Sequence, residues 1–415
     1  MSESSSLFAV MAHANPTITD LVQRTGGAQW LGDVCDGRTV AQFATQHAVD
    51  VAMVSSDDPL AAGVVDALLA EGIPTVGPTR SGAQIEWDKA FSRDVVAKIA
   101  PESNPRYLHV RSGDEVRAAI NYIGDGGAPV VVKPVGLAGG KGVKVVGPHL
   151  ADNEAAAQYA CEVIESGQHG GAVLIEERIA APEFTIQAMT DGKTVVFPPA
   201  TYDYPYRFDG DLGPGTGGMG SCTMPGGLLP FLDTKTYDQA CGIVQDAVDF
   251  LSKDGRTFSG CMNAGFFATD DGLRVIEFNA RFGDPEALNI MALFDGDWTD
   301  VMHAMAGRSL YPGNIPLGDD ASVVVYLVAP EYAIGVSQGH EFALDIKCAE
   351  ESGATVLFSA ATQRSQHDFV TVGTSRAVAM VARDSSLERA RSAAYDAIAR
   401  CVQGDLQWRS DIASF

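Results

Sequence analysis

Short apolar segments and amphipathic segments alternate through the first 87 residues. Residues 7–11 (LFAVM) and 50–54 (DVAMV) have the apolar character of buried strands. Asn15 or Thr17 can cap a helix after the first strand, and residues 59–72 predict a second helix that ends at a glycine. Repeated strand–helix–strand units indicate a parallel sheet flanked by helices, with ligands at the carboxyl ends of the strands.

A glycine-rich segment interrupts a valine-rich pattern at residues 130–146 (VVVKPVGLAGGKGVKVV). It is not a Walker-type phosphate loop, because Val135 occupies the place of the first glycine and Gly142 replaces the hydroxyl residue. Valines on both sides predict a strand, a glycine-rich turn and a second strand. Lys133 lies on a strand fit for burial, which favours a phosphate-binding role since a buried lysine is costly without an anion. For Lys141, phosphate binding and a merely solubilising role are equally compatible with the pattern.

Residues 274–286 (RVIEFNARFGDPE) carry polar side chains at every second position of a predicted strand. Alternate apolar residues face a core, so Glu277, Asn279 and Arg281 share the opposite face. Carboxylate and amide oxygens are hard ligands suited to Mg²⁺ that carries nucleotide phosphates. Arg281 can clamp a phosphate or a carboxylate with its planar guanidinium. The alternative is an ordinary solvated strand face, and the turn that follows favours the site.

An acidic segment follows the glycine-rich hairpin. A strand carrying Glu176 and Glu177 breaks at Ala181 and Pro182, and a second strand begins with Glu183. An extended hinge of this kind can offer backbone groups to an adenine edge and a carboxylate to ribose hydroxyls. The signal is weak by itself, because acidic residues at strand ends are usually just solvated.

Composition narrows the class of protein. The chain has 415 residues, enough for two to four packed units, and its formal net charge of −24 argues against a nucleic-acid partner. No apolar run reaches the length of a membrane span. Seven cysteines without a CxxC pair predict reduced thiols in a cytoplasmic protein. Eight histidines without HxH or HExxH spacing give little support to a zinc site.

The order of these features is informative: a lysine-bearing strand, a glycine-rich hairpin, an acidic hinge and then Glu-x-Asn. With DKAF (88–91), KPVGLAGGKGV, GPGTGGMGSCTMP and VIEFNARFGDPE, the sequence resembles the ATP-grasp ligases and, more closely, the phosphoribosylamine–glycine ligase family. The resemblance covers nearly the whole chain. It implies a multidomain α/β and α+β fold. The expected units are a Rossmann-like domain (1–87), an ATP-grasp A domain in two parts (88–127 and 190–311), a B or lid domain (128–189) and a small α+β C-terminal domain (312–415).

The resemblance also implies the site. ATP phosphates would be bound by Lys89 and Lys133 and covered by the loop of Gly139, Gly140, Lys141, Gly142 and Val143. Adenosine would be lined by Glu176, Glu177 and Glu183, and Mg²⁺ or Mn²⁺ would be held by Glu277 and Asn279. Substrates would be bound by His13, Asn15, Asp57, Asp203, Arg207, Gly217, Gly218, Met219, Gly220, Arg281 and Asp284. Arg281 and Lys133 would be the catalytic residues.

The implied reaction needs no side-chain nucleophile. ATP phosphorylates a small carboxylic acid, glycine or another amino acid, and an amine attacks the acyl phosphate to give an amide, ADP and phosphate. Positive charges neutralise the transferred phosphoryl group, and the closed loops exclude water. A monomer or a homodimer is expected.

The first loop departs from the family pattern. Where the family has Gly-x-Gly-Gly-Arg-Glu-His, this chain has MAHANPTI, and the acids Asp57 and Asp58 follow the second strand. Adjacent carboxylates would repel a phosphate ester, so we predict a ligase with an altered amine substrate. Two alternatives stay open: an authentic phosphoribosylamine–glycine ligase of purine synthesis, in which a helix N-terminus at residues 15–17 still binds phosphate, and a non-catalytic ATP-binding regulatory protein.

Overall fold

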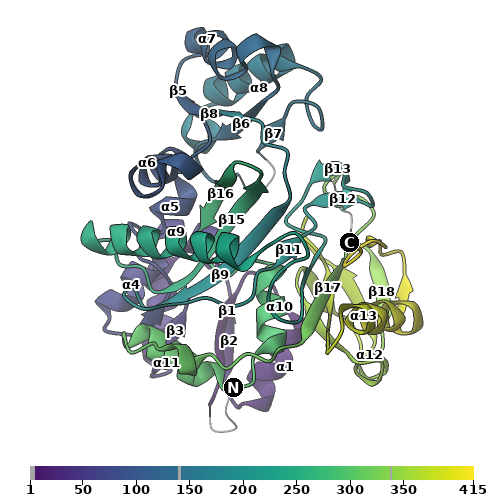
Figure 1. The fold of residues 1–415 in the computed structure, drawn as a ribbon. Helices are drawn as coiled ribbons and strands as arrows, with labels where there is room; N and C mark the ends of the chain where they lie inside the picture. The colour runs from purple at the N-terminus through teal and green to yellow at the C-terminus, as the bar shows by residue number, and fades with distance from the viewer. Residues whose placement is uncertain (1–4, 139–141, 337–338) are drawn as a thin grey trace.

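The N-terminal unit of the computed structural model contains two pairs of parallel strands with helices packed beside them (Figure 1). The structure describes residues 5–138, 142–336 and 339–415. In the N-terminal unit β1 (Phe8–Met11) pairs with β2 (Ala28–Leu31), and β3 (Ala52–Met53) pairs with β4 (Thr75–Val76). The helices are α1 (Pro16–Arg24), α2 (Gly37–Gln46), α3 (Asp57–Ala62) and α4 (Val64–Ala70). The single helix expected at residues 59–72 is divided, because Gly63 has a left-handed φ of 84°.

A four-stranded antiparallel sheet forms the unit at the top of Figure 1, with the order β5-β8-β6-β7. Its elements are β5 (Tyr107–Val110), α7 (Gly113–Ile123), η2 (Asp125–Gly127), β6 (Val130–Pro134), β7 (Lys144–Val145), α8 (Asn153–Ser166), η3 (Gln168–Gly170) and β8 (Val173–Glu177). Helix α7 shares one apolar core with β6 and α8. We therefore propose that the lid unit begins at β5, earlier than residue 128, because β5 pairs directly with β8.

The central sheet runs in the order β10-β9-β15-β16 and is entirely antiparallel. Its strands are β9 (Glu183–Thr190), β10 (Val195–Val196), β15 (Gly260–Thr269) and β16 (Gly272–Asn279). The helices α5 (Gln84–Trp87), α6 (Lys89–Ile99) and α9 (Thr234–Lys253) contact it, and η1 (Pro101–Ser103) follows α6. Phenylalanines of the three long strands and aliphatic residues of α6 and α9 make up the largest core. The opposite, polar side of β16 faces the lid.

The C-terminal unit is a five-stranded sheet with the order β11-β14-β17-β22-β19. Its strands are β11 (Tyr202–Asp203), β14 (Gly220–Thr223), β17 (Ala321–Leu327), β19 (Ala354–Phe358) and β22 (Val378–Asp384). Helices α12 (Ile346–Glu351) and α13 (Leu387–Cys401) pack beside it, next to a sheet of β18 (Glu341–Leu344), β20 (Ala361–Gln363), β21 (Asp368–Thr371) and β23 (Val402–Gly404). Because β11 and β14 come from the middle of the chain, this unit is joined to the central sheet through its own strands.

The remaining elements do not belong to the sheets described above. They are the hairpin of β12 (Tyr206–Phe208) and β13 (Leu212–Gly215), the helices α10 (Glu286–Leu293) and α11 (Trp298–Ala306), and η4 (Pro312–Asn314). The β12–β13 hairpin stands beside the lid unit in Figure 1. Among the described residues there is no helix with the length and apolar character of a membrane span.

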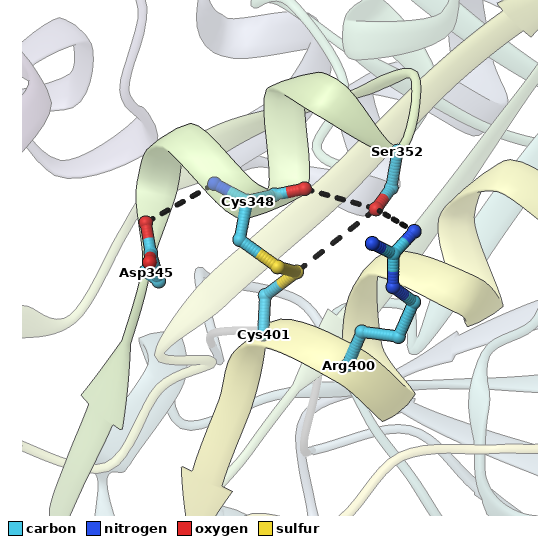
Figure 2. The surroundings of a disulfide bond; sticks show 5 residues. All are labelled: Asp345, Cys348, Ser352, Arg400 and Cys401. Carbon is cyan, nitrogen blue, oxygen red and sulfur yellow. Dashed lines mark hydrogen bonds between the residues drawn. A yellow bond between two sulfur atoms is a disulfide. The ribbon is translucent and has the colours of Figure 1, made fainter.

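A disulfide joins α12 to the end of α13, between Cys348 and Cys401 (Figure 2). The expectation that all seven cysteines are reduced thiols was therefore wrong for this pair. The two residues are 53 positions apart, and only the packing of α12 against α13 brings their Cα atoms to 5.7 Å. Ser352 and Arg400 lie beside the disulfide, with the Arg400 guanidinium donating to the Ser352 hydroxyl at 3.2 Å.

Candidate active site

A cavity of about 490 Å³ lies between the lid unit, the polar face of the central sheet and the loop after β11. This volume suits a nucleotide-sized ligand. The structure brings together at this cavity Asp57, Lys89, Lys133, Gly142, Val143, Glu176, Glu177, Glu183, Asp203, Gly217, Glu277, Asn279, Arg281 and Asp284. Residues of six separate segments of the chain therefore meet in one cleft.

Lys133 and Glu176 are held in a buried ion-pair network at the base of the cleft. The Lys133 ammonium lies 2.9 Å from the Glu176 carboxylate, and Arg93 approaches the same carboxylate at 2.6 Å. Burial alone would raise the pKa of Glu176, but the Arg93 and Lys133 charges outweigh it and lower this pKa to about 2. Glu176 therefore positions Lys133 and Arg93, and its carboxylate is occupied by them rather than turned toward a nucleoside.

Glu277 and Asn279 lie side by side on β16, as the alternation of the strand requires. The Asn279 amide donates to the Glu277 carboxylate at 3.5 Å, and both residues line the cavity. Lys89 lies in the first turn of α6. Burial lowers the pKa of Lys89, and the charge of the nearby Glu277 opposes this fall. Two hard oxygen donors beside a lysine in a cleft form a set that fits a divalent cation carrying phosphate groups.

Glu177 and Glu183 stand on either side of the hinge between β8 and β9. Glu177 accepts hydrogen bonds from the backbone and side-chain nitrogens of Arg106 at 2.9 and 3.0 Å. Glu183 faces the cleft, where desolvation raises its pKa to about 7 against the opposing charge of Lys133. Of the two, Glu183 has the carboxylate directed to the cavity, whereas Glu177 is engaged with the lid.

The far end of the cleft holds a dense group of acids. The pKa values of Asp203 and Glu286 are raised, mainly by burial and then, for Asp203, by the charge of its neighbour Glu286. An oxygen of Asp203 and the amide oxygen of Asn263 are buried without a hydrogen-bond partner in the described part of the chain. Unpaired acceptors next to carboxylates are the environment that a ligand with an ammonium group satisfies.

Arg376 organises the loop beside these acids. It lies 2.9 Å from an Asp284 carboxylate oxygen and donates to the carbonyls of Gly217 and Gly218. The Tyr326 hydroxyl donates to the second Asp284 oxygen at 2.6 Å. The glycine loop and Asp284 are therefore fixed by residues of the C-terminal unit.

Arg281 is paired with a residue that the sequence pattern did not indicate. Its guanidinium lies 3.2 Å from the Glu86 carboxylate, which also accepts from the backbone of Ala280 at 2.8 Å. Burial raises the pKa of Glu86 to about 7, although the Arg281 charge opposes the rise. Glu86 therefore positions Arg281 at the wall of the cleft.

Several predicted substrate residues lie outside this cavity. The His13 ring is hydrogen-bonded to the Ser359 carbonyl at 3.0 Å, and the Asn15 amide donates to the Phe358 carbonyl at 2.7 Å. Arg207 is 1% exposed and donates to the Tyr332 carbonyl at 3.1 Å.

The hydrogen bonds of His13, Asn15 and Arg207 direct these side chains to the C-terminal unit. Their partners are set by the packing of distant strands, which local sequence patterns do not reveal. Met219 and Gly220 are buried in β-sheet packing, and Gly218 has a left-handed φ of 98° beside Asp203. Gly139, Gly140 and Lys141 lie outside the described residues.

Comparisons with known proteins agree over the whole chain. The family models described as the N, ATP-grasp (A) and C domains of phosphoribosylglycinamide synthetase match residues 2–86, 87–287 and 322–415. Phosphoribosylamine–glycine ligase of Methanobrevibacter smithii is 38% identical over 98% of this chain and 91% of its own length. The ligase of Methanopyrus kandleri is 39% identical over 99% of this chain and 90% of its own. The chain belongs to the phosphoribosylamine–glycine ligase family.

Solved structures confirm the predicted fold class. The ligase of Thermotoga maritima has a TM-score of 0.78 at 20% identity, covering 97% of this chain and 99% of its own. The biotin carboxylase domain of Hydrogenobacter thermophilus 2-oxoglutarate carboxylase, with a TM-score of 0.72 at 14% identity, covers 97% and 91%. The chain is thus an ATP-grasp ligase with the three-part architecture of its family.

The ligase site also contains residues that sequence reasoning missed. Arg93, Glu86 and Arg376 each hold a predicted site residue in place, and each is separated from it by more than 80 positions. Glu286 and Asn263 belong to the acid cluster, and Glu286 ends the very motif that marked Glu277. Its place at the end of that motif was the signal that could have indicated it.

Proposed function

We propose that this ATP-grasp ligase joins glycine to phosphoribosylamine with hydrolysis of ATP to ADP and phosphate. Support comes from curated relatives that carry this activity in their names and align with this chain over 98% of its length. The observation that carries the proposal is the cleft in which Glu277 and Asn279 face Lys89 and Lys133. The comparisons support the authentic ligase better than the altered-amine ligase that we predicted from the first loop. As a metabolic ligase the protein would work in the cytoplasm.

The nucleotide would lie along the hinge with its phosphates at the two lysines. Glu277 and Asn279 would hold Mg²⁺, or Mn²⁺, because both present oxygen atoms on one face of β16. A bound cation would neutralise charge on the transferred phosphoryl group. Lys89, free of a carboxylate within ion-pair distance in the described part of the chain, would contact the same phosphates, and Glu183 would accept hydrogen bonds from ribose hydroxyls.

The acid substrate would lie at the cluster of Asp203, Glu286 and Asn263. These side chains supply two carboxylates and a free amide oxygen, which suit the ammonium group of an amino acid. The carboxylate of that substrate would then face Arg281 and the phosphates. Gly217 and Gly218, held by Arg376, would close the pocket around a substrate with a small side chain.

One observation keeps an altered amine as a second candidate. His13 and Asn15 bond to β19 and the residue after it, and Asn15 also caps α1 by accepting from the Ile18 amide at 3.1 Å. The first loop therefore offers less to a ribose phosphate than an open helix N-terminus would. Asp57 lines the cleft and adds a negative charge to its wall.

The test is an assay of ADP release with mass detection of the product. Glycine and freshly formed phosphoribosylamine are compared with other amino acids and with unphosphorylated amines, and Glu277→Ala serves as the inactive control. Formation of glycinamide ribonucleotide at a rate typical of the family, abolished in the control, supports the proposal. Amide formation with a different amine only would replace it with the second candidate. ATP binding without any product would favour a regulatory protein.

A further inference from the structure

A tight turn after β7 presents one histidine to the nucleotide cleft. The backbone amides of His149 and Leu150 both donate to the Val145 carbonyl, at 2.9 and 3.2 Å, and the Gly147 amide donates to the Leu150 carbonyl at 2.7 Å. Arg178, at the hinge, donates to the Val146 carbonyl at 3.1 Å. Six consecutive residues are therefore held in one conformation, and His149 projects from it into the lining of the cavity.

The orientation and protonation of the His149 ring are both determined. The Val145 amide donates to Nδ1 at 3.1 Å, so Nδ1 is an acceptor and the proton of the neutral ring lies on Nε2. Burial and then the Lys144 charge lower the pKa of this histidine, which favours the neutral form. Nε2 is buried and has no hydrogen-bond partner within the described residues. A buried donor without an acceptor is costly, and a ligand oxygen would remove that cost.

Two further side chains of the cleft surround the same space. The Tyr206 ring, from the β12–β13 hairpin, lies with its centroid 6.1 Å from that of the His149 ring. Burial and then the charge of Glu183 raise the pKa of Tyr206, so the phenol and this carboxylate are neighbours. His149, Tyr206 and Glu183 all line the cavity, at the lid, the hairpin and the hinge respectively.

We propose that the Nε2–H group of His149 donates a hydrogen bond to a ribose hydroxyl of the bound nucleotide, and that His149 and Tyr206 together cover the ribose. A neutral donor matches a neutral hydroxyl, whereas phosphate oxygens match Lys89 and the cation held by Glu277. This inference depends on the proposed function only in requiring that the cavity binds ATP. It adds a nucleotide-positioning residue that the motifs do not mark.

The test measures nucleotide affinity by calorimetry, with ATP, 2′-deoxy-ATP and 3′-deoxy-ATP in the presence of Mg²⁺. Loss of a single neutral hydrogen bond corresponds to roughly a 3- to 10-fold weaker Kd. We expect unaltered protein to lose about this factor with one of the deoxynucleotides. The His149→Phe variant should bind ATP more weakly by a similar factor. It should bind that deoxynucleotide no more weakly than the unaltered protein does, because both changes remove the same interaction.

The matched control is His109→Phe, the same substitution on β5 of the lid. His109 is not among the cavity-lining residues and accepts from the Arg111 guanidinium at 3.4 Å. The His109→Phe variant should bind all three nucleotides as the unaltered protein does. Equal loss in His149→Phe for all three nucleotides would overturn the inference. Equal affinity of the unaltered protein for the three nucleotides would also overturn it, and this measurement does not require any variant to fold. If unaltered protein fails to bind ATP at all, the proposed function fails instead.

Tyr206 is tested by the affinity for ATP in the same titrations. Tyr206→Phe keeps the ring over the ribose and should bind ATP as the unaltered protein does. Tyr206→Ala removes the ring, exposes the ribose to water and should bind ATP more weakly. An unchanged Kd in Tyr206→Ala would show that the ring does not cover the ribose.

Discussion

Replacing Glu176 with glutamine removes the negative centre of the buried network at the base of the cleft. The Glu176 carboxylate accepts from Arg93 at 2.6 and 2.9 Å and lies 2.9 Å from the Lys133 ammonium. The side chains of Glu176 and Arg93 are only 3% and 4% exposed. In Glu176→Gln two buried cations would therefore remain close together without a counter-charge, and the protein should be strongly destabilised.

The magnitude follows from the pKa of Glu176, which falls from 4.5 to about 2. At 1.36 kcal/mol per pKa unit this corresponds to about 3 kcal/mol of stability at neutral pH. Because the folded-state pKa is the lower one, this stability is fully present above pH 4.5 and is lost as the pH falls toward 2. The difference between the variant and the unaltered protein should shrink by about half between pH 7 and pH 3.

The assay is denaturant unfolding of both proteins at pH 7 and at pH 3, with Glu177→Gln as the matched control. Glu177 is the next residue of the same strand and pairs at 3.0 Å with Arg106, whose side chain is 57% exposed. Such a solvated pair contributes less than about 1 kcal/mol. A cost for Glu176→Gln no larger than that of the control, or a cost that does not decrease at low pH, would refute the electrostatic reasoning.

Three further substitutions test separate parts of the molecule. Glu277→Ala should lower ligase activity at least about 100-fold and abolish its dependence on Mg²⁺ concentration, and an unaffected rate would remove the metal assignment. Gly218→Ala places a Cβ 2.6 Å from the Asp203 carboxylate, at a φ of 98°. The KM for the amino acid should therefore rise more than the KM for ATP, and an equal rise of both would contradict a role of Gly218 at the acid pocket. Cys348→Ser should make unfolding insensitive to reductant, whereas the free energy of unfolding of the unaltered oxidised protein should fall by about 4 kcal/mol on reduction. Both are measured by denaturant titration, and equal sensitivity of the two proteins to reductant would exclude the disulfide.

Local alternation was sufficient to predict which side chains share a face. The two-residue period indicated that Glu277 and Asn279 lie together, and in the structure their side chains are 3.5 Å apart. The period does not hold along the whole strand, because an irregularity at Ile276 places Val275 and Phe278, three positions apart, in the same core. Glycine motifs and their order along the chain were sufficient to predict the ATP-grasp fold and the family, which the comparisons confirm. These features depend on neighbours in sequence or on whole motifs, so no tertiary contact has to be known.

Contacts between distant segments could not be predicted in the same way. Nothing near Arg93 or Arg376 in the sequence indicates that they bind Glu176 and Asp284, because packing of separate units places them there. His13 was assigned to a substrate for its type and position, yet its partner is a carbonyl of the C-terminal unit. The Cys348 disulfide likewise requires two helices to meet across 53 residues.

The charges of the cleft predict that an anionic ligand needs a divalent cation. Lys133, Arg281 and Arg376 each lie within 3.2 Å of a carboxylate, so their positive charges are already compensated. Among the predicted cations that line the cavity in the described part of the chain, Lys89 is the exception, since its ammonium donates to the Gly136 carbonyl at 3.5 Å and has no carboxylate within ion-pair distance. One buried lysine cannot balance a triphosphate next to Glu277, and a cation held by Glu277 and Asn279 would both cancel the acid and add positive charge. Removal of the cation should therefore lower the affinity for ATP much more than substitution of any one arginine that is paired with a carboxylate.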